Sequence, residues 1–164
     1  MAISGRYAEC RSRIKTGDII YFSGGTSIAS RLTQMVTKSP YFHVGMAFWI
    51  RDPMYASRLM IVEAHSGGRR IVSLSSYVGY GMSVLSFDNK WAVMADTLLD
   101  NTGAIPYSYF NYVGIGLKEL FGVKQFMLDE IRVLRGQVCS ELVSEYLQGC
   151  GISVSNMSSP CTQI

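Results

Sequence analysis

The chain has 164 residues, of which 48% are hydrophobic and 16% are charged, and its formal net charge is +3. This length supports one domain over residues 1–164 with a substantial core, and it is too short to predict two. The basic residues are scattered, which argues against a nucleic-acid partner. The N-terminus lacks the apolar run of a signal peptide, and the longest apolar stretches are too short to cross a bilayer. We therefore expect a soluble, cytoplasmic protein without stable membrane insertion.

The first half of the chain predicts strands and one helix. Residues 19–22 form a β-rich apolar run that ends at turn residues, which predicts the first strand. Thr26 or Ser27 can cap a helix that ends before Pro40. The apolar residues of this helix fall on one face: Ile28, Leu32, Met35 and Val36. Further apolar runs predict strands that would continue as an antiparallel meander: 44–50, 59–64, 71–74 and 84–87.

The second half of the chain predicts helices. Their ranges are 91–99, 107–121 and a last helix within 135–152, which Gly149 and Gly151 would end. Strands in the middle of the chain and helices on both sides predict an α+β fold in which helices flank a central antiparallel sheet.

The cysteines and histidines lack the spacing of a metal site. The chain has four cysteines and two histidines; no two cysteines form a CxxC pair, and the histidines lie 22 residues apart. Without an export signal, free thiols are favoured over disulfides. We predict no metal and no cofactor.

Cys139 lies at the predicted start of the last helix, where unpaired N–H groups and the helix dipole favour a thiolate. The helix alone fits a packed thiol at least as well as a nucleophile. His43 precedes the apolar run 44–50, and Glu63 and His65 share one face at the end of the next predicted strand. If these strands pair, a carboxylate can reach the imidazole; an equally common arrangement leaves such residues in solvent.

Four segments together resemble a known family. They are TGDIIYFSGGTSIASRLTQMVTKSPYFHVGMAF, MIVEAHSGG, GAIPYSYFNYVG and VCSELVSEYLQGCGI. They are similar, in this order, to the permuted papain-like cysteine peptidase family of the YiiX and YaeF type. That family belongs to the NlpC superfamily and is related to the lecithin retinol acyltransferase group. The resemblance covers residues from about 16 to 152 and implies a circularly permuted papain-like fold.

The resemblance implies a role for each matching residue. Cys139 would be the nucleophile, His43 the general base and later acid, and Glu63 the group that orients His43. Tyr146 matches a tyrosine of the family, with a packing or substrate role, and His65 is an additional polar group that would assist or replace Glu63. In the permuted order the nucleophile helix comes last, so a base upstream of Cys139 is expected.

The function implied is a cysteine hydrolase that cleaves an amide bond through a thioacyl-enzyme intermediate. Its substrate would be a peptide, an isopeptide or a peptidoglycan stem. A lipid-directed thioesterase or acyltransferase with an acyl substrate would use the same Cys–His pair. A binding module that keeps the fold without turnover is the third alternative.

Overall fold

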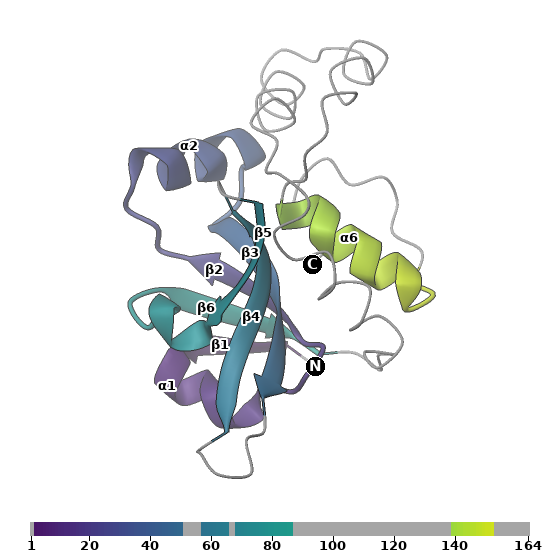
Figure 1. Ribbon diagram of the computed structural model, residues 1–164. Helices are drawn as coiled ribbons and strands as arrows, with labels where there is room; N and C mark the ends of the chain where they lie inside the picture. The colour runs from purple at the N-terminus through teal and green to yellow at the C-terminus, as the bar shows by residue number, and fades with distance from the viewer. Residues whose placement is uncertain (1, 51–56, 66–67, 87–138, 153–164) are drawn as a thin grey trace.

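The computed structural model describes residues 2–50, 57–65, 68–86 and 139–152 (Figure 1). This part of the chain is α+β, with one six-stranded antiparallel sheet and three α-helices. The strands are β1 (Ala2–Arg6), β2 (Ile19–Ser23), β3 (Tyr41–Ile50), β4 (Arg58–His65), β5 (Gly68–Ser73) and β6 (Gly81–Leu85). The helices are α1 (Tyr7–Cys10), α2 (Ile28–Thr37) and α6 (Cys139–Gly149), with 3-10 turns η1 (Arg11–Arg13) and η2 (Leu74–Tyr77). The predicted helices 91–99 and 107–121 lie outside the described residues.

The strand order is β1-β6-β2-β3-β4-β5. Strands β2 to β5 are consecutive neighbours, which confirms the predicted meander for β3, β4 and β5. The prediction that residues 84–87 continue it was wrong, because β6 returns to the other side of β2. In this register Phe22 pairs with Met82 and Ile20 pairs with Val84. All four side chains are buried, so the position of β6 buries its apolar residues against those of β2.

The structure differs from the prediction at two further places in the first half of the chain. The sequence did not predict β1 and α1, because residues 2–10 lack a long apolar run; β1 is held by its pairing with β6. Strand β3 begins at Tyr41, so His43 lies inside the strand and not just before it. His43 pairs with Phe22 of β2, and the register shifts immediately afterwards, at a bulge between Phe22 and Ser23.

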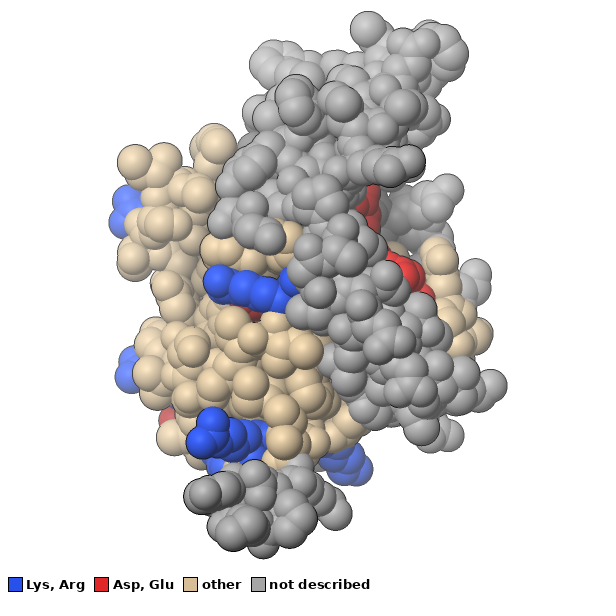
Figure 2. Space-filling view, viewed as in Figure 1, with Lys and Arg blue, Asp and Glu red and all other residues tan. Residues whose placement is uncertain are grey.

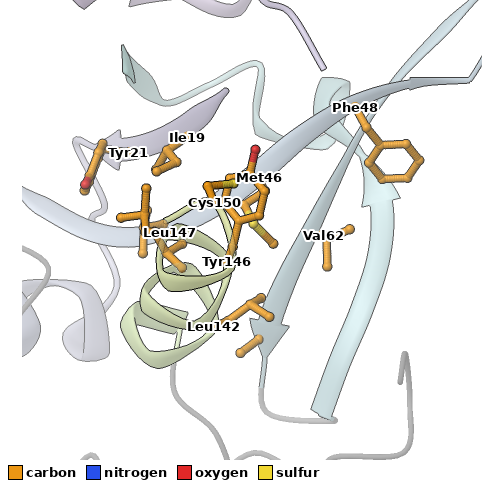
Figure 3. Close-up of a cluster of buried hydrophobic side chains, with 12 residues drawn as sticks. Ile19, Tyr21, Met46, Phe48, Val62, Leu142, Tyr146, Leu147 and Cys150 are labelled. Atoms are coloured by element: carbon orange, nitrogen blue, oxygen red, sulfur yellow. The ribbon is translucent and has the colours of Figure 1, made fainter. Parts of the chain in front are cut away.

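Each face of the sheet has its own buried cluster. Helix α6 covers one face (Figure 1) and packs Leu142, Val143 and Tyr146 against the sheet. Figure 3 shows this cluster, in which the labelled strand residues are Ile19, Tyr21, Met46, Phe48 and Val62. The opposite cluster includes Cys10, Ile14, Ile20, Phe22, Ile61, Leu74 and Met82. The sheet is therefore buried on both faces.

Helix α2 has the predicted cap but not a buried apolar face. The Ser27 hydroxyl accepts a hydrogen bond from the Ser30 backbone N–H at 3.1 Å, which satisfies an otherwise unpaired donor of the first turn. The helix ends at Thr37 and is capped by Lys38, which has a left-handed φ of 52°. The side chains of Ile28, Leu32 and Met35 are exposed, and that of Val36 lies outside those that the structure describes. No helix in the described part of the chain is long and apolar enough to cross a bilayer.

The buried tyrosine of α6 provides a test of how this helix is anchored. The Tyr146 hydroxyl donates to the Gly17 carbonyl at 3.1 Å. We expect Tyr146→Phe to lower the free energy of unfolding by about 1 kcal/mol, because a buried carbonyl loses its donor. Urea unfolding measures the change. The control is Tyr7→Phe, at a partly buried hydroxyl that accepts from Arg11, and it should cost less. An equal cost for both variants would contradict this anchoring role.

Candidate active site

His43 and Glu63 form the centre of the site. The His43 Nε2 lies 2.8 Å from Glu63 Oε2. The side chain of Glu63 is fully buried, and that of His43 is 12% exposed. Strands β3 and β4 are antiparallel neighbours in which Met46 pairs with Val62, so His43 and Glu63 lie near the same end of the two strands. The structure thus brings together the predicted base and the predicted orienting group.

Two further side chains hold the Glu63 carboxylate. Tyr77, at the end of η2, donates its hydroxyl to Oε2 at 2.6 Å. Arg70, which is the partner of Glu63 in the β4–β5 register, donates from Nε to Oε1 at 2.7 Å. Its Nη2 also lies 2.7 Å from Oε1. Both carboxylate oxygens are therefore engaged, and the carboxylate has little freedom to turn away from His43.

These contacts determine the charges in the site. Burial disfavours the charged form of His43, but hydrogen bonds and charge from Cys139 and Glu63 outweigh it and raise its pKa to about 9. Burial also disfavours the Glu63 carboxylate, but His43, Tyr77 and Arg70 outweigh it and lower its pKa to about 2. Burial and the adjacent carboxylate raise the pKa of Tyr77, which therefore stays a proton donor to Glu63. At neutral pH the site holds an imidazolium–carboxylate pair.

Aromatic rings fix the plane of the imidazole. Phe22 stacks on His43 with ring centroids 5.7 Å apart, and Tyr77 stacks on it at 6.1 Å. Phe22 and Tyr77 also stack on each other at 4.2 Å. Rotation of the His43 ring would break these contacts as well as the hydrogen bond to Glu63.

Cys139 is the first residue of α6. Its thiol is half-buried and lies close enough to His43 to raise the pKa of the imidazole. Because Nε2 of His43 is bonded to Glu63, the other ring nitrogen, Nδ1, remains for the sulfur. Helix α6 covers the sheet face that contains Val44 and Met46, and His43 alternates with these residues along β3. The thiol and the ring therefore meet at the end of the sheet, where β3 and α6 begin.

The structure also places the two supporting candidates. Tyr146 is fully buried and bonds to the Gly17 carbonyl, a packing position that joins α6 to the turn before β2. His65, at the end of β4, is exposed. Burial and the nearby positive charge of Arg70 lower its pKa. Glu63, and not His65, bonds to the His43 ring.

Sequence reasoning missed Arg70 and Tyr77. A partial signal for Arg70 was available, because neighbouring residues of a strand point to opposite faces. Arg70 meets Glu63, while the buried Arg69 donates to Glu145 of α6 at 2.9 Å on the other face. Tyr77 lies in a 3-10 turn, where no periodic pattern marks a buried role.

The described residues do not suit a metal ion. Across the described ranges, no group of three or more His, Cys, Asp or Glu side chains could hold one. Glu63 and His43 are two such side chains, and a guanidinium already occupies one carboxylate oxygen of Glu63.

Comparison with known proteins gives a similarity of fold. No protein-family model matches the chain, and no curated protein matches it. Among solved structures, the chain is similar to one described as "metalloprotein yiiX from Escherichia coli O157:H7, DUF1105". The two are 25% identical, and their TM-score is 0.53. The match covers 83% of this chain and 66% of that chain. The chain therefore has a YiiX-like α+β fold.

Proposed function

We propose that this protein is a cysteine hydrolase that cleaves an amide bond through a thioacyl-enzyme intermediate. The observation that supports it is the placement of His43 between a buried carboxylate, 2.8 Å from Nε2, and a thiol at the start of a helix. A nucleophile, its base and an orienting group in this relation are the elements of a catalytic triad. With the nucleophile last in the chain, we also propose that the fold is a permuted papain-like one.

The proposed reaction uses only side chains of this chain. The Cys139 thiolate attacks the amide carbonyl carbon, and the oxygen becomes negative in a tetrahedral intermediate. The backbone N–H of Cys139, at the start of α6, would donate to this oxygen. The His43 imidazolium then gives its proton to the leaving amine, and the carbon–nitrogen bond breaks. Neutral His43 next takes a proton from water, which attacks the thioester, and Cys139 leaves as the thiolate.

Glu63 supports this cycle by charge and orientation. A carboxylate at Nε2 fixes the tautomer that presents Nδ1 to the sulfur, and it stabilises the imidazolium. The similar YiiX protein is described as a metalloprotein.

The substrates that we propose are a peptide, an isopeptide or a peptidoglycan stem. A lipid-directed thioesterase or acyltransferase is the second candidate, because three apolar side chains of α2 are exposed, and α2 is joined to the strand that carries His43. A matched panel of peptide and thioester substrates separates the two. Absence of turnover on both, with intact ligand binding, would favour a binding module.

The first prediction for the proposed site concerns thiol reactivity. We expect iodoacetamide to alkylate Cys139 near neutral pH faster than Cys10 and Cys150, which are both buried. Because exposure alone would favour Cys139, the decisive comparison is His43→Ala, which should slow the alkylation of Cys139 by removing the base. Mass spectrometry of the labelled peptides measures the rates. An unchanged Cys139 rate in His43→Ala would show that the thiol does not depend on the imidazole.

The second prediction concerns the third member of the triad. We expect Glu63→Gln to reduce turnover by up to about four orders of magnitude, the effect of amidating the acid of a serine triad. His65→Asn serves as the matched control on the same strand, and it should cost far less because this side chain is exposed. Steady-state kinetics on the best substrate of the panel compares them. Loss of activity in His65→Asn with little change in Glu63→Gln would reverse the assignment.

The third prediction concerns stability and pH. The pKa of folded His43, about 9, lies above its ordinary value of 6.5, so the folded state holds this proton more tightly. This stabilisation is complete below about pH 6.5 and disappears as pH rises through about 9, a loss of roughly 3 kcal/mol at most. Urea unfolding at several pH values should show the loss in the wild type and a smaller one in His43→Gln. Equal slopes for both proteins would contradict it.

A further inference from the structure

Helix α2 has its apolar side turned outward. Ile28 is 88% exposed, Leu32 44% and Met35 64%. At 100° per residue these three positions fall within one narrow stripe of the helix. A helix on the surface of a globular protein normally turns such a stripe toward the core. Exposure of these three side chains therefore needs a reason outside the core.

The opposite, polar side of α2 faces the protein. Ser30, Thr33 and Gln34 are each half-buried. The Gln34 side-chain amide donates to the Pro40 carbonyl at 2.7 Å. A Cβ placed on Gly25 would lie 2.5 Å from the Ser30 Cβ and 2.8 Å from the Phe42 ring, so Gly25 permits close packing around Ser30. These contacts fix the rotation of the helix and keep its apolar stripe outward.

Basic residues border this stripe. Arg31 and Lys38 are exposed; on a helical wheel Arg31 lies at one edge of the apolar stripe, and Lys38 is the cap at the C-terminal end of the helix. The sequence contains no Asp or Glu from residue 19 to residue 51. Figure 2 shows no acidic side chain over the part of the surface formed by α2. The outward surface of α2 is thus both apolar and positively charged.

We propose that the outward face of α2, formed by Ile28, Leu32, Met35, Arg31 and Lys38, docks this protein peripherally on an anionic lipid surface. An amphipathic helix lies in the membrane interface with its apolar side chains below the headgroups and its basic side chains beside the lipid phosphates. The charge favours this occupant over a second copy of the chain, because a symmetric pair of α2 helices would bring like charges together. Three side chains also offer far less area than a stable dimer needs.

This docking would place the candidate site near the membrane. Only Ser39 and Pro40 separate the Lys38 cap from Tyr41, the first residue of β3, and His43 follows two residues later. The proposal concerns binding only and is independent of which bond the site cleaves. It requires no helix that spans the bilayer.

Vesicle sedimentation tests the proposal with the full chain carrying Cys139→Ser, so that no turnover interferes. We expect stronger binding to vesicles that contain phosphatidylglycerol than to pure phosphatidylcholine, and weaker binding at high salt. Ile28→Gln together with Met35→Gln should reduce binding by at least about tenfold, since each side chain loses its burial in lipid. Neutralising Arg31 or Lys38 with Gln should each cost roughly fivefold on the anionic vesicles alone.

Matched controls come from the other end of the sheet. Ile50 is 43% exposed and pairs with the exposed Arg58, so Ile50→Gln and Arg58→Gln make the same chemical changes away from α2. They should leave binding unchanged. Equal losses in the control and α2 variants, or no binding of the parent protein to anionic vesicles, would overturn the proposal. So would a dimer, detected by light scattering, that the Ile28 and Met35 double variant converts to monomers.

Discussion

The buried carboxylate of Glu63 is the constraint on which the candidate site depends. A charge without solvent access is costly unless hydrogen bonds and opposite charges surround it. Glu63 has these from three different elements: His43 of β3, Arg70 of β5 and Tyr77 of η2. The same contacts that keep the carboxylate ionised therefore fix the relative positions of these elements. The imidazole orientation follows from this network as well as from the stacking of Phe22.

Helix α6, which carries the proposed nucleophile Cys139, is held by a separate set of contacts on the other face of the sheet. Tyr146 ties α6 to the turn before β2, and Arg69 ties Glu145 of the same helix to β5. Apolar packing of Leu142 and Val143 fills the space between these polar contacts. The start of α6 is thus fixed by the body of the helix, and Cys139 reaches His43 where the sheet ends. The neighbouring residues Arg69 and Arg70 point to opposite faces of the sheet. Arg69 bonds to Glu145 of α6, and Arg70 bonds to the Glu63 carboxylate.

Much of this arrangement could be predicted from sequence, for identifiable reasons. The strands from 19 to 65 have apolar runs bounded by turn residues, and the pairing of two such runs brings His43 close to Glu63. The position of β6 could not be predicted, because the pattern of a strand indicates which face is buried but not which neighbour it pairs with. Arg70 and Tyr77 were missed for a related reason. Their roles depend on the register of β5 and on a 3-10 turn, neither of which has a periodic pattern. The orientation of α2 could not be predicted either. Its hydrophobic periodicity shows that one face is apolar, but it does not show whether that face packs against the core.

The order of the site along the chain has a consequence for how the protein is made. Every described side chain that bonds to Glu63 lies between residues 43 and 77, and Cys139 follows much later. During synthesis, N-terminal segments leave the ribosome first and begin to fold first. The imidazole, carboxylate, guanidinium and phenol can therefore assemble while the thiol has not yet been translated. Cys139 would then join a charge network that already exists once α6 packs on the sheet.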